Sequence, residues 1–383
     1  MTDLALDRRL ILSMAAAVFA SAASIQTAAA QPRARADGNL FGLVEIGSSG
    51  VKPSIVRILS GDEPDLQVVK ALTNVEANAI DTVNAPIVAR AVKSALDAFA
   101  AEGIGQGLTI VVGSSGVASV PAAKEAVAEA VRREVGLEIG FVSVEDEVRY
   151  TFDGVVNRVR LAHRRPQVVL VDIGSGNTKG GYVIPIAGVG ERFQTFSTPL
   201  GVKSFSRAVQ AKRGGAPMAE AARQVAEQDL RPALRRMIAT EGGPMLLQRD
   251  RVYLTGGLPW ALATTQNPRN TDRYVPISIA QIQRFTNQAT TDQIALFNVD
   301  TAAIPSPGQR TLIEGDLKRL REQVFTPDEF VCGGELLRVL SEEMGFARRT
   351  VFFARPGRMA WLMGVAFNRV ADGTISEEVL PTA

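Results

Sequence analysis

Hydrophobic positions along the chain fall into short apolar runs and longer amphipathic segments. Mostly apolar runs of strand length occupy residues 108–112, 168–171 and 251–254, and glycine follows closely after each run. Residues 121–135 instead repeat alanine and valine at helical spacing, with proline at the start and glycine just past the end, which predicts a helix. Strands that alternate with helices predict an α/β fold.

One short pattern occurs twice. Residues 44–52 read VEIGSSGVK and residues 171–179 read VDIGSGNTK, and each copy follows an apolar run. Another strand-like segment follows each copy, at residues 54–59 and 181–186. Both copies therefore predict a strand, a tight glycine turn and a second strand, and their repetition predicts two similar lobes.

The segment GSGNTKG at residues 174–180 also looks like a damaged dinucleotide-binding loop. A Rossmann loop must open directly into a helix whose N-terminus faces the pyrophosphate. Here the next amphipathic helix is expected only from about Val202. The context therefore disfavours a dinucleotide-binding fold.

Three further segments predict a strand, a glycine turn and a helix. The turns are residues 113–116, 255–257 and 333–334, and in the last segment residues 330–332 would form the strand and 335–344 the helix. Glycine lets the backbone approach a ligand, and the free N–H groups at a helix start favour an anion. Glycine at such turns also has a purely steric explanation, so both interpretations stay open.

Composition narrows the class of protein. The chain has 383 residues, of which 46% are hydrophobic, so it can bury the cores of two domains. The single Cys332 excludes an intrachain disulfide, and the single His163, expected to be exposed, argues against zinc sites and Ser-His-Asp triads. The formal charge of +2 is small. Arginines gather at residues 158–165 and 231–236, either to attract a polyanion or as solvated helix faces.

Residues 1–30 have the pattern of a cleavable export signal. Asp7, Arg8 and Arg9 precede an uncharged, alanine-rich stretch that ends in three alanines before Gln31. A membrane anchor is the competing interpretation, but serine and threonine interrupt the run and alanine is barely apolar enough. The arginine pair also resembles a twin-arginine signal, so the export route stays open. After a flexible linker at residues 31–40, the mature chain is expected to be periplasmic or secreted.

From about residue 42 to 367 the sequence resembles the exopolyphosphatase and guanosine pentaphosphate phosphohydrolase (Ppx/GppA) family. The matching pieces are EIGSSGVK, VVGSSGVAS, GLEIGFVSVEDEVRYTFDGV, VVLVDIGSGNTKGGYV, TPLGVKSF, VYLTGG and FVCGGELL. The most specific of them places Glu147 and Arg149 before an apolar helix that ends in Gly154 and Val155. The resemblance implies two actin/hexokinase-like (ribonuclease H-like) lobes, residues 41–165 and 166–383, with mixed sheets flanked by helices and a cleft between the lobes.

The resemblance also implies a site for phosphoanhydride cleavage, which needs phosphate ligands, charge neutralisation and a group that activates water. Glu147 would be the general base, and Asp172, with Glu45, would hold Mg²⁺ or another divalent cation. Glu147 equally suits the first turn of any helix, and the two lysines below could be surface hairpin residues. The implied phosphate-binding residues are Gly47, Ser48, Ser49, Gly50, Lys52, Ser114, Ser115, Gly174, Ser175, Gly176, Asn177, Thr178, Lys179, Gly256 and Gly257.

Three positions depart from the family pattern. The chain has Glu45 where the family has aspartate, Lys179 where it has glutamate, and Ala118 where we align its arginine. Lys179 would replace the lost arginine as a phosphate ligand. These changes leave phosphate binding in place and keep two functions open: an exopolyphosphatase-like enzyme, or a catalytically silent protein that binds a polyanion or nucleotide in the same cleft.

The export signal weighs on the choice of partner. ATP is scarce outside the cytoplasmic membrane, which argues against kinases, chaperones and actin-like polymerisation. The expected ligand is therefore polyphosphate or a phosphorylated small molecule. We expect no nucleic acid and, after signal cleavage, no membrane as a partner, and a homodimer stays open.

Overall fold

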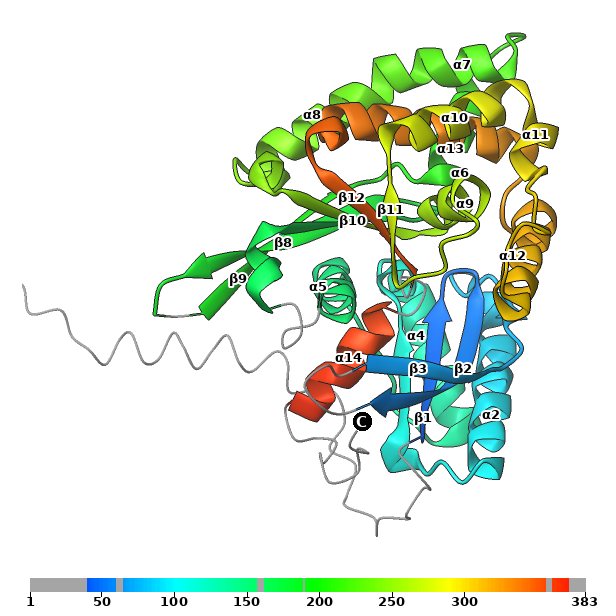
Figure 1. Cartoon of the computed structure of the whole chain (residues 1–383). Coiled ribbons are helices and arrows are strands. Elements are labelled where there is room, and N and C mark those ends of the chain that lie inside the picture. The colour runs from blue at the N-terminus through cyan, green and yellow to red at the C-terminus, as the bar shows by residue number, and fades with distance from the viewer. Residues whose placement is uncertain (1–39, 60–64, 157–161, 189, 356–359, 372–383) are drawn as a thin grey trace, which may run out of the picture. The chain divides into compact units, whose positions relative to one another are not determined.

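A computed structural model describes residues 40–59, 65–156, 162–188, 190–355 and 360–371 (Figure 1). The expected export signal at 1–30 and most of the linker at 31–40 lie outside these residues, so both stay predictions. No helix in the described ranges combines the length and the apolarity that a bilayer crossing requires.

The chain contacts divide the protein into two units. Among the described residues, the N-terminal unit runs from Leu40 to Glu147 and includes residues 369–371, and the C-terminal unit comprises Val148–Asn368. The division lies inside helix α5 (Val144–Val155), whereas the sequence analysis placed it at 165/166. Most of α5 belongs to the second unit because Val148, Phe152 and Val155 share a buried cluster with strands of that unit.

The N-terminal unit contains a mixed sheet in the order β3-β2-β1-β5-β6, with β4 paired to β2. The first three strands form antiparallel pairs, whereas β5 is parallel to β1 and β6 is parallel to β5. The strands are β1 (Leu40–Gly47), β2 (Gly50–Leu59), β3 (Asp65–Ala71), β4 (Val75–Glu76), β5 (Thr109–Gly113) and β6 (Gly140–Phe141).

Two long helices cover this sheet. Helix α2 (Ala85–Ala101) packs on β1 and β2 and against α4 (Pro121–Val135). A Cβ at Gly42 would lie 2.3 Å from the ring of Phe99, so the glycine lets α2 lie directly on β1. The predicted helix at 121–135 is confirmed, with proline in its first turn and Gly136 left-handed at φ 70°. The short elements are η1 (Thr82–Asn84), η2 (Gln106–Leu108) and α3 (Ser115–Ala118).

The C-terminal unit repeats the plan. Its sheet has the order β11-β12-β10-β7-β8-β9, in which β7, β8 and β9 are antiparallel and β10 and β12 continue parallel to β7. The strands are β7 (Val168–Ile173), β8 (Thr178–Ile186), β9 (Gly190–Thr198), β10 (Arg251–Gly256), β11 (Tyr274–Ile277) and β12 (Thr350–Ala354). Two mixed sheets flanked by helices confirm the predicted actin/hexokinase-like fold class.

Helices cover both faces of the second sheet. Val169, Val171 and Ile173 of β7 enter one buried cluster, while Val168 and Leu170 enter another, as the alternation of strand side chains requires. The α-helices beyond α5 are α6 (Val202–Lys212), α7 (Met218–Val225), α8 (Arg231–Met237), α9 (Gly257–Gln266), α10 (Ile279–Thr291), α11 (Gln293–Phe297), α12 (Pro307–Arg319), α13 (Pro327–Glu343) and α14 (Ala360–Ala371). The remaining helical elements are the 3₁₀ helices η3 (Ala162–Gln167), η6 (Leu246–Gln248) and η8 (Phe346–Arg348) and the π-helices η4 (Ala226–Leu230), η5 (Ile238–Gly242) and η7 (Leu320–Val324).

The third predicted strand, glycine turn and helix is wrong. Residues 330–334 lie inside α13, which begins with a capping box between Thr326 and Glu329. A Cβ at Gly333 would lie 2.8 Å from Leu258, and one at Gly334 would lie 3.2 Å from the backbone of Thr286. The glycines therefore let α13 approach α9 and α10 closely and do not form a turn.

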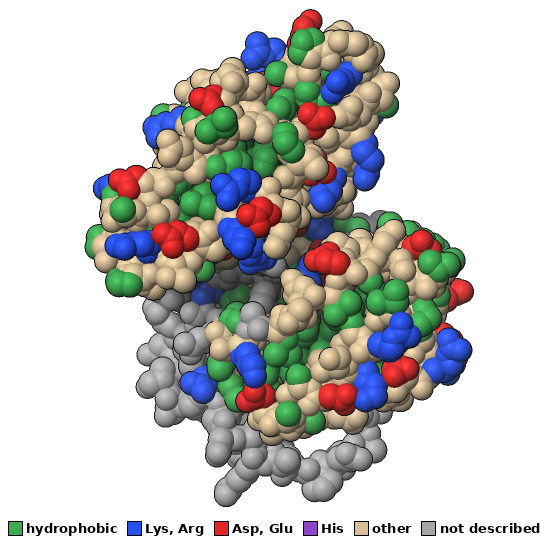
Figure 2. All heavy atoms as spheres, turned by 90° about the vertical axis from the view of Figure 1, so that its right-hand side faces the viewer, with side chains coloured by type: hydrophobic (Ala, Val, Ile, Leu, Met, Phe, Trp, Pro, Cys, Tyr) green, Lys and Arg blue, Asp and Glu red, His purple; other side chains and the backbone are tan. Residues whose placement is uncertain are grey.

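One arginine of each arginine-rich segment forms several ion pairs, while Arg158 and Arg160 lie outside the described residues. Arg165 is 3% exposed and donates to the Val156 carbonyl, Asp153 and Glu191. Arg231 contacts Glu227, Glu342 and Glu343 at 2.5–2.6 Å. On the face shown in Figure 2, basic and acidic side chains are interspersed. For Arg165 and Arg231 these contacts replace both predicted alternatives, a polyanion patch and a solvated helix face. His163 is exposed, as predicted.

Helices α5 and α14 cross where each carries a glycine. A Cβ at Gly154 would lie 1.9 Å from the carbonyl oxygen of Ala360. We expect Gly154→Ala to lower the free energy of unfolding by about 1–3 kcal/mol, because the two backbones must separate. Gly315→Ala is the control, since an added Cβ meets nothing within 4 Å on α12; it should stabilise the helix by up to about 1 kcal/mol. Urea unfolding measures both, and equal effects would contradict this packing.

The Arg231 cluster predicts a pH dependence of stability. The hydrogen bond from Arg231 lowers the pKa of Glu227 from 4.5 to about 2. Because its pKa is lowered in the folded protein, the ionised Glu227 stabilises the folded state above pH 4.5. This stabilisation is lost as the pH falls from 4.5 to about 2. We expect the stability difference between wild type and Arg231→Met to narrow over this range in urea titrations. Arg132→Met, which removes an exposed pair with Glu129, should be nearly neutral throughout; a gap for Arg231→Met that is independent of pH would contradict the assignment.

Candidate functional site

The two repeated sequences form equivalent β-hairpins. Glu45 is directly opposite Lys52 across β1 and β2, and Asp172 is directly opposite Lys179 across β7 and β8. Residues directly opposite in an antiparallel pair project from the same face, with Cβ atoms about 4.5–5.5 Å apart. The predicted strand, turn and strand is therefore confirmed in both units, and each hairpin carries one acid and one lysine side by side.

In the N-terminal unit the acid and the lysine form an ion pair. Lys52 Nζ donates to Glu45 Oε1 at 2.6 Å, and the side chains are 38% and 9% exposed. A Cβ at Gly47 would lie 2.7 Å from Glu45 Oε1 and 3.4 Å from Lys52 Nζ. The pair thus lies over Gly47, and only glycine leaves room for it.

The parallel strand β5 brings a second loop to this hairpin. The Ser114 N–H donates to the Ile46 carbonyl at 2.9 Å, and Ser114 and Ser115 are both buried. A Cβ at Gly116 would lie 2.2 Å from Ser48 Oγ, so the hairpin turn contacts the start of α3. The structure therefore brings these predicted phosphate-binding residues together within one unit.

Glu147 reaches the same loop. Its Oε2 accepts a hydrogen bond from the Ser115 N–H at 2.8 Å. Glu147 is in the first turn of α5, as the alternative interpretation expects. Its carboxylate nevertheless lies beside the loop that follows β5. This contact orients one carboxylate toward the loops of the N-terminal unit.

In the C-terminal unit β10 supplies the neighbour of Asp172. Thr255, which is fully buried, donates from Oγ1 to Asp172 Oδ1 at 3.0 Å. Gly256 has φ 97°, and a Cβ there would lie 2.2 Å from the Ile173 carbonyl oxygen and 3.0 Å from Asp172 Oδ1. Gly256 therefore lies at the predicted site, whereas a Cβ at Gly257 would contact the ring of Phe325 at 3.2 Å.

The loop at 174–177 is fixed by the start of α6. The Gly174 carbonyl accepts from the Val202 N–H at 3.0 Å, and the Ser175 carbonyl accepts from Lys203 and Ser204 at 2.9 and 3.1 Å. The N-terminus of α6 is thus occupied by the loop's own carbonyl groups. Ser204 Oγ also donates to the Gly176 carbonyl at 2.8 Å.

Both hairpin turns carry backbone N–H groups that could bind an anion. Within the described residues, the N–H groups of Ser175, Gly176 and Asn177 donate to no backbone acceptor, and the same holds for Ser48 and Ser49. Ser49, Ser175 and Gly176 are exposed. Successive outward N–H groups in a turn are a favourable arrangement for an anion. The geometry of each hairpin turn is therefore compatible with phosphate.

Two of the predicted phosphate ligands have other environments than expected. Thr178 is fully buried, and its hydroxyl donates to the Leu200 carbonyl at 2.8 Å. Lys179 is only 5% exposed. Its burial rules out the alternative of a surface hairpin lysine. A buried ammonium group requires a compensating partner, and Asp172 is opposite it on the same face of the sheet.

Neither hairpin by itself offers the set of oxygen ligands that a divalent cation needs. Among the described residues, no group of three or more His, Cys, Asp and Glu side chains is placed to hold a metal ion. Mg²⁺ and Ca²⁺ need several oxygen ligands. Each hairpin offers one carboxylate, and each carboxylate has a lysine opposite it. The expected pair of metal ligands, Glu45 and Asp172, comes from different units, and the predicted cleft between the lobes stays a prediction.

Thr255 and Gly201 were not among the predicted site residues. A Cβ at Gly201 would lie 2.4 Å from the Gly174 carbonyl oxygen and 2.6 Å from the Asn177 N, so this glycine shapes the loop. Both residues lie in motifs that resemble the family, VYLTGG and TPLGVKSF. The motifs marked the segments, but only the pairing of β7 with β10 and the position of α6 bring them to the loop.

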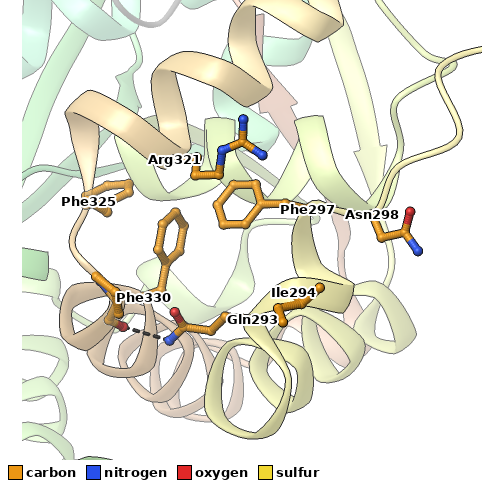
Figure 3. Close-up of a pocket in the computed structure, with 8 residues that line it drawn as sticks. Gln293, Ile294, Phe297, Asn298, Arg321, Phe325 and Phe330 are labelled. Atoms are coloured by element: carbon orange, nitrogen blue, oxygen red, sulfur yellow. Dashed lines mark hydrogen bonds between the residues drawn. The ribbon is translucent and has the colours of Figure 1, made fainter.

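A separate apolar pocket of about 620 Å³ lies in the C-terminal unit (Figure 3). The rings of Phe297, Phe325 and Phe330 surround it, Arg321 lies at its edge, and the Gln293 amide donates to the Pro327 carbonyl at 2.8 Å. None of the predicted site residues lines it. This pocket is therefore distinct from the glycine loops.

Two ribonuclease H-like units, each with an acid-bearing antiparallel hairpin and a parallel neighbouring strand, define a protein of the actin/hexokinase class. The Ppx/GppA phosphatase family model matches residues 72–266. The chain belongs to this family. No curated protein sequence matches it.

Solved structures support the same fold. The Aquifex aeolicus member of the Ppx/GppA family is 17% identical, aligned over 88% of this chain and 99% of that chain with a TM-score of 0.59. An exopolyphosphatase from Cytophaga hutchinsonii is 13% identical over 87% and 98% of the chains, with a TM-score of 0.54. Nucleoside triphosphate hydrolases from Neospora caninum are 10% identical, aligned over 94% of this chain and 96% of that chain, with a TM-score of 0.51. At these identities the similarity shows a shared fold.

The contact between Gly201 and the loop can be tested by adding one methyl group. We expect Gly201→Ala to destabilise the protein by about 1–3 kcal/mol, because a Cβ would overlap backbone atoms of the loop. Gly176→Ala is the matched control, since a Cβ there meets nothing within 4 Å, and it should change stability by less than about 0.5 kcal/mol. Both are measured by urea unfolding. If Gly201→Ala is as stable as the control, the loop is not held against α6.

Proposed function

We propose that this protein is an exopolyphosphatase-like phosphohydrolase that cleaves phosphoanhydride bonds of polyphosphate or a related phosphorylated compound. The observation that carries the proposal is the position of Glu147, whose carboxylate accepts from the Ser115 N–H at 2.8 Å beside the hairpin turn at Ser48. Membership of the Ppx/GppA phosphatase family supports it, as does the fold shared with the Cytophaga hutchinsonii exopolyphosphatase.

The proposed reaction transfers the terminal phosphoryl group to water. Backbone N–H groups of the glycine turns bind the phosphate oxygens, and Glu147 accepts a proton from the attacking water. The water oxygen forms a bond to the terminal phosphorus as the bridging P–O bond breaks. Inorganic phosphate and a chain shorter by one phosphate leave. The Ser115 N–H holds the carboxylate in position for this step.

The second candidate is a catalytically silent protein that binds a polyanion or nucleotide at the same loops. The lysine directly opposite the acid in each hairpin favours it, because an ammonium group can bind a phosphate oxygen while its charge offsets that of the neighbouring carboxylate. Calorimetry distinguishes the two functions. Salt-dependent binding of polyphosphate without phosphate release would support the silent protein.

The expected export signal at residues 1–30 leads us to propose a periplasmic or secreted protein. Cell fractionation with detection of the mature N-terminus near Gln31 tests this location. Recovery of the full chain in the cytoplasm would contradict it.

The enzyme hypothesis predicts the effect of two substitutions. We expect Glu147→Gln and Asp172→Asn each to lower phosphate release from long-chain polyphosphate by about a hundredfold or more, because the first loses its proton acceptor and the second a charge at the loop. Glu145→Gln is the matched control, since Glu145 is an exposed acid in the same helical turn; its activity should equal that of wild type. Thermal unfolding shows that all variants fold. Full activity in both site variants would rule out these roles.

A further inference from the structure

We propose that phosphate binding at the glycine turns of this protein needs no divalent cation, because Lys52 in one unit and Lys179 in the other each supply an ammonium group at the turn of their own hairpin. This inference rests on phosphate binding at the glycine turns, as in the proposed function. The structure offers one carboxylate in each hairpin and sets a lysine directly opposite it at the equivalent register position. The repetition of this pair in both units argues that it is part of the site.

The N-terminal hairpin shows how the lysine competes with a metal ion. Glu45 Oε1 already accepts from Lys52 Nζ at 2.6 Å, and the carboxylate side chain is only 9% exposed. A divalent cation at this oxygen would have to displace the ammonium group or lie next to it, and like charges at such separations repel. The carboxylate is therefore compensated without a metal ion.

The same lysine keeps the capacity to bind phosphate. An ammonium group has three N–H donors, and the contact with Glu45 uses one. The Lys52 side chain is 38% exposed and lies beside Gly47, in the turn that carries the Ser48 and Ser49 N–H groups. Lysine is a common point-charge ligand of phosphate. Glu45 then holds the ammonium group in place at the turn.

The C-terminal hairpin repeats this arrangement more deeply. Lys179 is 5% exposed and Asp172 is opposite it. Asp172 Oδ1 also accepts from the Thr255 hydroxyl at 3.0 Å, so one of its two oxygens already has a protein donor. Glutamate at position 179 would instead give two carboxylates on one face, a better start for a divalent cation site.

An exposed ion pair between a lysine of the same sheet and a glutamate at the end of α2 provides the matched comparison. Lys70 on β3 donates to Glu102 at 2.6 Å, with both side chains more than 40% exposed. The bond length equals that of Lys52 and Glu45, but neither residue belongs to the two hairpins that carry the predicted phosphate-binding residues. Lys70→Met therefore removes an equivalent ion pair away from the loops.

The first experiment measures binding of pyrophosphate to the full chain by calorimetry, in EDTA and then with added Mg²⁺. We expect affinities that agree within about threefold, and Lys52→Met and Lys179→Met to weaken binding by about tenfold or more, since each loses a charged hydrogen bond. Lys70→Met should bind as wild type does. Binding that is lost in EDTA and restored by Mg²⁺ would overturn the inference, as would unchanged affinity in both site variants.

The second experiment introduces a carboxylate with Lys179→Glu. We expect this variant to bind Mn²⁺, detected by the loss of the free-ion electron paramagnetic resonance signal, whereas wild type does not. Thermal unfolding verifies that the variant folds, and Lys179→Gln, which removes the charge without adding a ligand, controls for the loss of lysine. Stoichiometric Mn²⁺ binding by wild type at the phosphate loops would contradict the proposal.

The outcomes separate this inference from the proposed function. Pyrophosphate binding in EDTA without hydrolysis of polyphosphate would contradict the proposed enzyme activity and support the metal-independent site with lysine. Hydrolysis that requires Mg²⁺ would support the proposed enzyme activity and overturn the inference that lysine replaces the cation. Phosphate release in EDTA supports both.

Discussion

The register of two short hairpins is the constraint on which the rest of the site depends. A tight turn between β1 and β2 pairs Gly47 with Gly50 and so fixes Glu45 opposite Lys52. The equivalent turn between β7 and β8 fixes Asp172 opposite Lys179. A slip of one residue would send each lysine to the other face of its sheet. Hairpin pairing thus determines which charges a ligand at each loop meets.

Close packing around glycine then completes each loop. The absent side chains of Gly47 and Gly116 leave room for the Glu45 carboxylate and the Ser48 hydroxyl, while those of Gly201 and Gly256 leave room for backbone of the second loop. Because the ligands offered are chiefly backbone N–H groups, the site depends on chain conformation more than on particular side chains. Glu147 is the exception, since its carboxylate is held by the Ser115 N–H.

The chain has the fold of its family but different charges at motif positions. Its family membership therefore does not by itself determine its chemistry. The Ppx/GppA match and the shared fold follow from the order of strands, turns and helices. The chemistry depends on a few side chains, because exchanging one acid for a lysine reverses the charge presented to phosphate and removes an oxygen ligand. The position of Glu147 supports the hydrolase hypothesis. The lysines at both hairpins are the proposed source of positive charge in place of a divalent cation.

The sequence by itself predicted the features that depend on local residue patterns. These are the repeated hairpins, the helix at 121–135 and the motifs that resemble the family. Tertiary structure decided the rest. Residues 330–332 look like a strand, but the Thr326 cap and close contacts with α9 and α10 make them helical. The burial of Lys179 and the bond from Thr255 to Asp172 join segments far apart in sequence. No local pattern carries such contacts, because parallel pairing and burial depend on how distant segments pack.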